Sequence, residues 1–239
     1  MHIAVLMANT DESAFAAAHP RDGEKFVQLL SPLRPDWRFS VFNVKDGVFP
    51  DSQAGIDGVI VTGSPASVHD ADAWVGRLLA LIRQIVAGGV PLFGACFGHQ
   101  AIALALGGEV ARNPGGWVLG TAATQMEGMG PLRLYAAHLE QVTRLPLDAR
   151  VIGTTPGCPL AAMAIGTRVM TTQYHPEMTP AFIAALTDEL AGKLPVEVIA
   201  RARASLGAKA DTARIAAHMV AFLEAAHQDR AASKSIAVT

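Results

Sequence analysis

The chain has 239 residues, of which 51% are hydrophobic and 17% are charged, and its formal net charge at pH 7 is −2. This length and composition predict one α/β domain over residues 1–239 with enough apolar residues for a sizeable core. The charge argues against a basic surface for nucleic acid, and no apolar run approaches the roughly 18 residues of a membrane span.

The N-terminal segment leads directly into a strand-like run, without the basic start, apolar middle and small-residue cleavage site of a secretory signal. The chain has two cysteines, Cys96 and Cys158. Two cysteines without a secretion signal argue against a disulfide framework. A cytoplasmic protein is therefore expected.

Short apolar runs and helical patterns alternate along the first half of the chain. The runs predict strands at residues 2–8, 37–44, 58–62 and 91–95, and the patterns predict helices at 24–30, 74–87 and 97–106. Glycine pairs at 88–89 and 107–108 suit the ends of the last two helices. This alternation predicts a parallel sheet that is covered by helices on both faces.

The pattern changes after residue 109. Strand-like runs with little helix between them follow at 118–126, 132–136, 150–154, 160–165 and 168–174. These runs predict antiparallel or mixed strands added to the parallel core. Three helices are then predicted, at 180–191, 195–206 and 211–226. The domain thus comprises a core over 1–190, C-terminal helices over 191–230 and a frayed tail over 231–239.

The first motif that points to chemistry is Gly94–Gln100, with the sequence GACFGHQ. It places Cys96 in a tight turn between a strand and a helix, and Gly94 and Gly98 remove β-carbons that would crowd this turn. An isolated cysteine is more often buried and inert. The flanking glycines at a strand-to-helix turn instead indicate a nucleophile elbow with cysteine in place of serine, above a helix N-terminus that stabilises thiolate.

The second motif is Gln173–Glu177, with the sequence QYHPE, at the end of another predicted strand. The carboxyl ends of parallel strands meet at one edge of a sheet, so His175 is expected beside Cys96. His175 would act as the base, and Glu177 would hold its imidazole in one tautomer. Without the Cys96 motif, a histidine at this position is more simply interpreted as a residue of a surface loop.

A glycine follows a predicted strand at the same edge of the sheet. The backbone amides of Gly63 and Phe97 could form a two-donor oxyanion hole. Taken alone, the segment around Gly63 is more simply an ordinary turn.

In this order and spacing, the three segments resemble the class I glutamine amidotransferase domain, and in particular its stand-alone, GMP-synthase-like members. The resemblance implies a flavodoxin-like, mixed but mostly parallel sheet flanked by helices. It also implies that Cys96 attacks the side-chain amide of glutamine, forms a γ-glutamyl thioester and releases ammonia. Hydrolysis of the thioester by water would complete the cycle.

The resemblance also implies substrate-binding residues. Gln100 matches the residue that helps to hold glutamine. The stretch from His138 through Leu139 and Glu140 resembles a His-x-Asp-x-Val segment whose backbone lines the glutamine pocket. Here Glu140 stands in the Asp position, which is a departure from the family pattern. On its own, His138 is more often structural than catalytic.

Several alternatives stay open from the sequence. The released ammonia could pass to a separate synthetase subunit, or the protein could be a stand-alone peptidase of γ-glutamyl compounds; a homodimer is also open. A non-catalytic regulatory protein on this fold is a third reading, against which the chain keeps Cys96, His175 and Glu177. No cofactor is expected, since no phosphate-binding Gly-x-x-x-x-Gly-Lys-Ser/Thr run occurs. No metal is expected either, since the spacing of His69, Asp70 and Asp72 fits no metal site.

Overall fold

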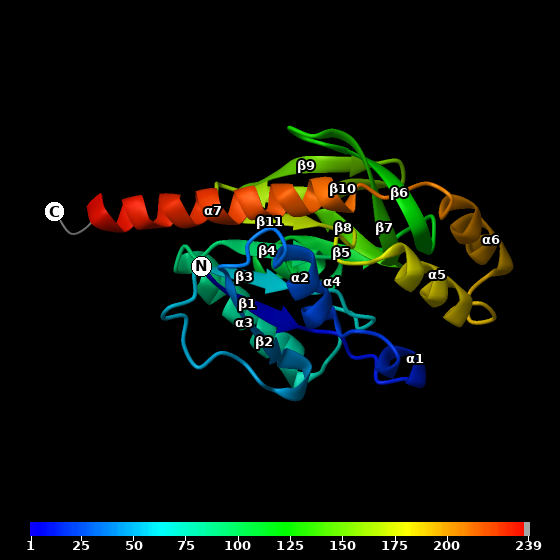
Figure 1. Ribbon diagram of the computed structural model, residues 1–239, viewed down its shortest axis with the longest axis horizontal. Helices are drawn as coiled ribbons and strands as arrows, with labels where there is room; N and C mark the ends of the chain where they lie inside the picture. The colour runs from blue at the N-terminus through cyan, green and yellow to red at the C-terminus, as the bar shows by residue number, and fades with distance from the viewer. Residues whose placement is uncertain (237–239) are drawn as a thin grey trace.

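The computed structural model describes residues 1–236 (Figure 1). Within them, the main sheet has nine strands in the order β2-β1-β3-β4-β11-β10-β9-β6-β7, and β5 and β8 form a separate pair. The strands are β1 (His2–Met7), β2 (Arg38–Asn43), β3 (Gly58–Val61), β4 (Leu92–Ala95), β5 (Glu109–Arg112), β6 (Val118–Met126), β7 (Gly130–His138), β8 (Glu140–Arg144), β9 (Ala149–Thr155), β10 (Cys158–Ile165) and β11 (Val169–Thr172). The helices are α1 (Ala14–Ala17), α2 (Asp22–Leu30), α3 (Ala73–Ala87), α4 (Phe97–Ala105), α5 (Pro180–Glu189), α6 (Val196–Ser205) and α7 (Thr212–Ile236), with a 3₁₀ turn η1 (Val44–Asp46).

The sheet has a parallel half and an antiparallel half. Strands β2, β1, β3, β4 and β11 run parallel, with Val5 opposite Ile60 and Phe93 opposite Met170. Beyond β11, strands β10, β9, β6 and β7 pair antiparallel. The predicted mixed α/β sheet and its added antiparallel strands are therefore confirmed. The carboxyl ends of β3, β4 and β11 lie side by side at one edge.

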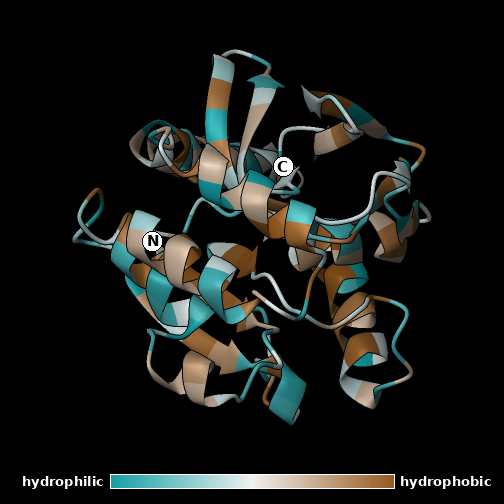
Figure 2. Cartoon of the chain, turned by 90° about the vertical axis from the view of Figure 1, so that its right-hand side faces the viewer, coloured by the Kyte–Doolittle hydropathy of each residue, from teal (hydrophilic) through white to brown (hydrophobic). Residues whose placement is uncertain are grey.

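Helices cover both faces of the parallel half, and the two faces have separate cores. Successive side chains of a strand point to opposite faces. Val5 therefore packs in the cluster that contains Phe26 of α2 and Leu223 of α7, whereas Leu6 packs in the cluster of α3 and α4. Both strand residues are fully buried. Burial of a side chain of this size contributes roughly 1.5–3 kcal/mol to folding. Figure 2 shows many of the hydrophobic segments towards the centre of the fold.

Local signals in the sequence explain where the helices begin and end. Gly89, with a φ of 63°, and Gly107, with a φ of 91°, take left-handed conformations just after α3 and α4, as their glycine pairs predicted. At the start of α5, the Thr179 hydroxyl accepts a hydrogen bond from the Phe182 amide at 3.1 Å, and Pro180 occupies the first turn.

The structure corrects the sequence interpretation at three places. Helix α1 lies in a segment for which the sequence predicted no helix, because four residues are too few to show a period. The β5–β8 pair was also missed, since both strands are short. The expected tail from Ala231 is wrong as far as Ile236, because α7 continues to that residue. Arg168 contacts this part of the helix: it forms an ion pair with Asp229 and donates a hydrogen bond to Ser233 Oγ at 2.6 Å. Residues 237–239 of the expected tail lie outside the described residues.

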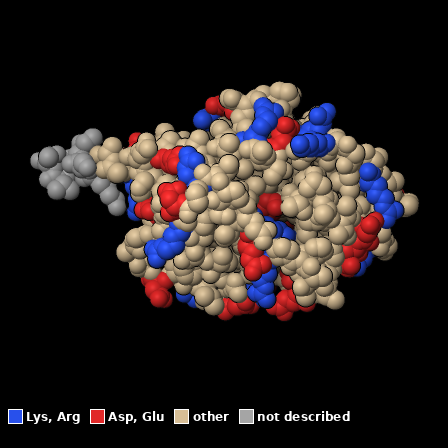
Figure 3. All heavy atoms as spheres, in the orientation of Figure 1, with Lys and Arg blue, Asp and Glu red and all other residues tan. Residues whose placement is uncertain are grey.

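The surface carries charges of both signs. On the face shown in Figure 3, lysine and arginine side chains alternate with aspartate and glutamate and do not gather into one patch. Among residues 1–236, no helix combines the length and the apolar character that crossing a bilayer requires.

Candidate active site

Cys96 occupies a strained turn between β4 and α4. Its φ of 50° and ψ of −105° make it the one non-glycine residue with positive φ in the described chain. Such a conformation costs on the order of 1–3 kcal/mol and persists where the surrounding structure enforces it. A β-carbon on Gly94 would lie 2.7 Å from the backbone of Gly98, and one on Gly98 would lie 2.3 Å from the Val61 carbonyl oxygen. The turn therefore requires the two glycines that flank Cys96.

His175 follows β11, and its backbone amide donates a hydrogen bond to the Tyr135 carbonyl at 2.8 Å. Its Nδ1 lies 2.7 Å from Glu177 Oε1, and the two side chains are only 6% and 0% exposed. A carboxylate only accepts hydrogen bonds, so Nδ1 carries the proton in this pair. The other ring nitrogen, Nε2, has no hydrogen-bond partner within the described residues.

The charges around His175 favour its imidazolium form. Burial alone would lower the pKa of His175, but the charges of Glu177 and Cys96 outweigh burial and hold this pKa well above 6.5. A histidine with a raised pKa beside a cysteine can keep a proton while the sulfur is a thiolate. The arrangement suits nucleophilic attack by sulfur.

Gly63 lies against the side chains of Cys96 and His175. A β-carbon at Gly63 would be 2.8 Å from His175 Cε1 and 3.7 Å from Cys96 Cβ. The structure therefore brings Gly63, Cys96 and His175 together from the ends of β3, β4 and β11. Phe97 begins α4, so its amide has no acceptor within the helix. That the backbone amides of Gly63 and Phe97 form an oxyanion hole stays a prediction.

The residues predicted to bind substrate lie beside α4 and β8. Gln100 Nε2 donates to the Glu140 carbonyl at 2.7 Å and lies 3.2 Å from Gln173 Oε1. The Glu140 carbonyl also accepts from His138 Nδ1 at 3.0 Å. The next carbonyl back, that of Leu139, accepts from the amide of Asn113 at 2.8 Å. Gln100 thus ties this segment to the elbow helix, and its role in holding a substrate stays a prediction.

Two contacts to the Cys96 sulfur were not foreseen from the sequence. Gln173 Nε2 lies 3.7 Å from Sγ, and Sγ lies 3.9 Å from the carbonyl oxygen of Ala137. Gln173 stands two residues before His175 in the same motif, which was the available signal. A chain of amides therefore connects Gln100 through Gln173 to the sulfur.

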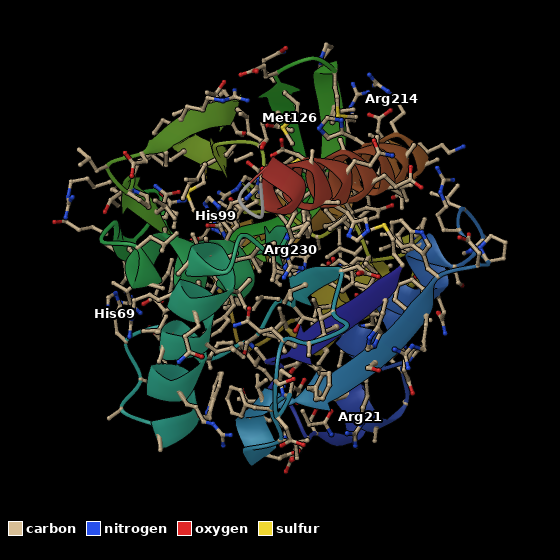
Figure 4. The ribbon with its side chains drawn as sticks, turned by 90° about the vertical axis from the view of Figure 1, so that its left-hand side faces the viewer. Arg21, His69, His99, Met126, Arg214 and Arg230 are labelled. Carbon is tan, nitrogen blue, oxygen red and sulfur yellow. The ribbon has the colours of Figure 1, made fainter. Side chains whose placement is uncertain are left out.

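Two further histidines are buried near the site and are neutral at neutral pH. His99, on α4, donates from Nε2 to the Leu160 carbonyl at 3.1 Å, and its Nδ1 lies 2.6 Å from Thr171 Oγ1 (Figure 4). Burial lowers the pKa of His99 to about 3 and that of His138 to about 4. Neither residue is suited to hold a proton during a reaction at neutral pH.

These two histidines predict a loss of stability in acid. Unfolding lets each imidazole bind a proton below its unfolded pKa of 6.5, whereas the folded protein resists this until about pH 3 or 4. Each should therefore lower the free energy of unfolding by roughly 1.2–1.4 kcal/mol per pH unit between pH 6 and pH 5. His175 adds nothing in this window, because it is protonated in both states. Urea denaturation at the two pH values measures the slope.

The comparison variant for this prediction is His99→Asn. It should reduce the pH slope by about 1.2 kcal/mol per unit, because one of the two titrating groups is removed. An unchanged slope in this variant would contradict the assignment of a neutral, buried His99.

A family model and several known proteins match this chain. The family model described as Glutamine amidotransferase class-I matches residues 37–183. The chain is 36% identical over 133 residues to a GMP synthase [glutamine-hydrolyzing] of Aeropyrum pernix, a match that covers 51% of this chain and 24% of that protein. The chain thus spans about a quarter of the length of the curated relatives that it matches first.

Solved structures show the same fold. A glutamine amido transferase from Methylobacillus flagellatus superposes with a TM-score of 0.72 at 20% identity, covering 95% of this chain and 94% of that one. A glutamine amidotransferase from Thermotoga maritima superposes with a TM-score of 0.70 at 17% identity, covering 95% and 97%.

Proposed function

Because the chain belongs to the class I glutamine amidotransferase family, we propose that Cys96, His175 and Glu177 hydrolyse the side-chain amide of glutamine through a γ-glutamyl thioester. The observation that carries this proposal is the strained Cys96 turn beside the His175–Glu177 pair, whose Nδ1 and Oε1 are 2.7 Å apart. Residues 1–239 act in this proposal as one amidotransferase domain.

The reaction begins with attack of the Cys96 thiolate on the amide carbon of glutamine. The amides of Gly63 and Phe97 stabilise the negative oxygen that develops. His175 then gives its proton to the departing nitrogen, so that ammonia leaves and a thioester remains. Water attacks the thioester with His175 as the base, which releases glutamate and restores the thiol. Glu177 keeps the imidazole in the tautomer that each step needs.

The relatives named GMP synthase support a partner for the ammonia. Those proteins are described as glutamine-hydrolysing synthases, and this chain covers about a quarter of their length. We therefore include in the proposal a separate synthetase subunit that receives the ammonia. Incubation of the purified protein with glutamine, with glutamate and ammonia measured separately, tests the hydrolytic half of the proposal directly. Failure to form glutamate under any condition would overturn it.

Replacement of Glu177 by glutamine tests its orienting role. The Glu177→Gln variant should lose roughly 10²- to 10⁴-fold in kcat, less than the loss from removing the nucleophile, because the base stays but its tautomer is no longer held. The variant also loses the negative charge that raises the pKa of His175. The high-pH limb of its kcat/KM profile should therefore move to lower pH.

A matched control for this prediction is Glu197→Gln, at an exposed position in the first turn of α6. It should leave both kcat and the pH profile unchanged. A Glu177→Gln variant with a wild-type rate and profile would show that Glu177 does not act on His175.

A further inference from the structure

A cavity of about 360 Å³ opens on the His175 side of the site. Its walls come from the loop and helix between β1 and α2, the turn after β3, and α5. Apolar and aromatic side chains form much of the lining: Met7, Phe15, Trp117, Met178, Phe182 and Leu186. Figure 1 shows α1 beside α5 at the edge of the molecule, where the Phe15 and Phe182 rings lie 5.8 Å apart. The reaction described above makes no use of most of this cavity.

The cavity reaches residues that lie next to the nucleophile Cys96. His175 lines it, and so does Ala137, whose carbonyl contacts the Cys96 sulfur. The residues expected to hold the glutamyl end, namely Gln100 and the segment 138–140, do not line it. In amide hydrolysis the histidine protonates the departing nitrogen, so the leaving group must lie beside His175. The cavity is therefore placed to receive the leaving-group side of a substrate.

The cavity is much larger than ammonia requires. A water molecule, which is close to ammonia in size, occupies about 30 Å³ in the liquid. A cavity of about 360 Å³ can hold a ring or a branched chain on the departing nitrogen. Ammonia as the leaving group would occupy only a small part of this volume.

The buried ammonium group of Lys25, in the cavity wall, is paired with a carboxylate of the protein. Lys25 Nζ lies 2.7 Å from Asp22 Oδ1, and both side chains are less than 9% exposed. The same ammonium lies 3.4 Å above the centre of the Phe182 ring. Lys45 at the rim is paired with Glu12. Asp11 and Arg21 also line the cavity, and both are exposed to solvent at its rim. With the two ammonium groups paired, the deeper lining favours an uncharged, apolar group over a carboxylate or a second ammonium.

Much of the cavity wall lies outside the part of the chain that the family model matches. That match covers residues 37–183, whereas the segment 9–25 falls before it, and Leu186 of α5 and Leu190, just past α5, fall after it. The residues proposed for the shared chemistry, Cys96 and His175, fall within the match. The wall is thus suited to set the substrate preference of this chain.

We propose that this cavity binds the leaving amine of N-substituted γ-glutamyl amides whose substituent is an aromatic or branched aliphatic group. The inference rests on the proposed function, because it uses the same thioester. Cys96 sulfur bonds to the γ-carbonyl carbon, the carbon–nitrogen bond breaks, and the proton on His175 passes to the nitrogen, so that a free primary amine departs. Water then cleaves the thioester to glutamate and restores the thiol.

The test compares two substrates on the full-length protein. Steady-state kcat/KM is measured for L-glutamine and for γ-glutamyl anilide, with glutamate quantified in both assays. We expect the anilide to be preferred by about tenfold or more, because its ring gains apolar contacts that ammonia cannot make. Hydrolysis of glutamine without hydrolysis of the anilide would overturn the inference and leave the proposed function standing. Hydrolysis of neither substrate would overturn both.

A pair of variants on α1 tests whether the preference for the anilide depends on the cavity. Ala16 lines the cavity, whereas Ala14 on the same helix is exposed and does not. Ala16→Phe fills the cavity and should lower kcat/KM for the anilide by about tenfold while glutamine hydrolysis changes less than about twofold. The matched Ala14→Phe variant should change neither. An equal loss on both substrates in Ala16→Phe, in a protein as stable as the control, would overturn the inference.

Discussion

The Cys96→Ala variant should lose glutamine hydrolysis by on the order of 10⁴-fold or more, because the sulfur that forms the proposed thioester is gone. Its fold should survive. Alanine keeps the β-carbon of Cys96, so the strained φ of 50° is unchanged, and only one sulfur atom is removed from a site that is 4% exposed. The free energy of unfolding should therefore change by about 1 kcal/mol or less. Glutamate formation and urea denaturation measure the two quantities.

The matched control for this variant is Cys158→Ala. Cys158 is also buried, and its burial raises the pKa of its thiol to about 12, so this sulfur stays protonated and unreactive at neutral pH. The control should keep wild-type turnover. Glutamine hydrolysis that persists at a near wild-type rate in Cys96→Ala would refute the proposed nucleophile.

The Gly98→Ala variant should be damaged in both stability and rate. The added β-carbon would lie 2.3 Å from the Val61 carbonyl oxygen and 2.9 Å from its carbon, and backbone of a buried strand cannot rotate away. The start of α4 must then move away from β3, at a cost of roughly 2–3 kcal/mol in unfolding free energy. A shift of about 1 Å at the nucleophile can lower kcat by roughly 10²-fold. Denaturation and steady-state kinetics on one preparation measure both effects.

Gly76→Ala provides the comparison for this prediction. Gly76 lies within α3, and a β-carbon there would meet nothing within 4 Å. Alanine should stabilise that helix by about 0.5–1 kcal/mol and leave the rate unchanged. If Gly98→Ala behaved like Gly76→Ala, the crowded elbow described above would be wrong.

The sequence was most informative where local chemistry determines local structure. The glycine pairs after α3 and α4 and the apolar strands of the parallel half could be predicted, since each depends on a few neighbouring residues. The pairing of β6 with β9 could not, because Gln125 and Thr154, which lie opposite each other, are distant in the sequence. Past Ala231, α7 is contacted at Ser233 by Arg168, a residue far away in the chain that a local pattern does not include.

The candidate site, too, could be predicted only in part from the sequence. The short motifs around Cys96 and His175 predicted that these two residues meet, because strand ends of a parallel sheet lie at one edge. The contact of Gln173 with the sulfur could not be predicted, since it depends on how one side chain turns inside the sheet. The cavity beside His175 was also missed. Its α1 wall comes from a segment for which the sequence predicted no helix, and its lining brings together Phe15 and Phe182, which are distant in the sequence.

Covalent labelling with a glutamine-analogue electrophile, followed by peptide mapping, tests the central role of Cys96 most directly. The reagent carries the γ-glutamyl group into the site and alkylates the sulfur that attacks it. We expect one modified peptide containing Cys96, loss of labelling in Cys96→Ala, and no label on Cys158. A label on Cys158 with Cys96 left unmodified would refute Cys96 as the nucleophile.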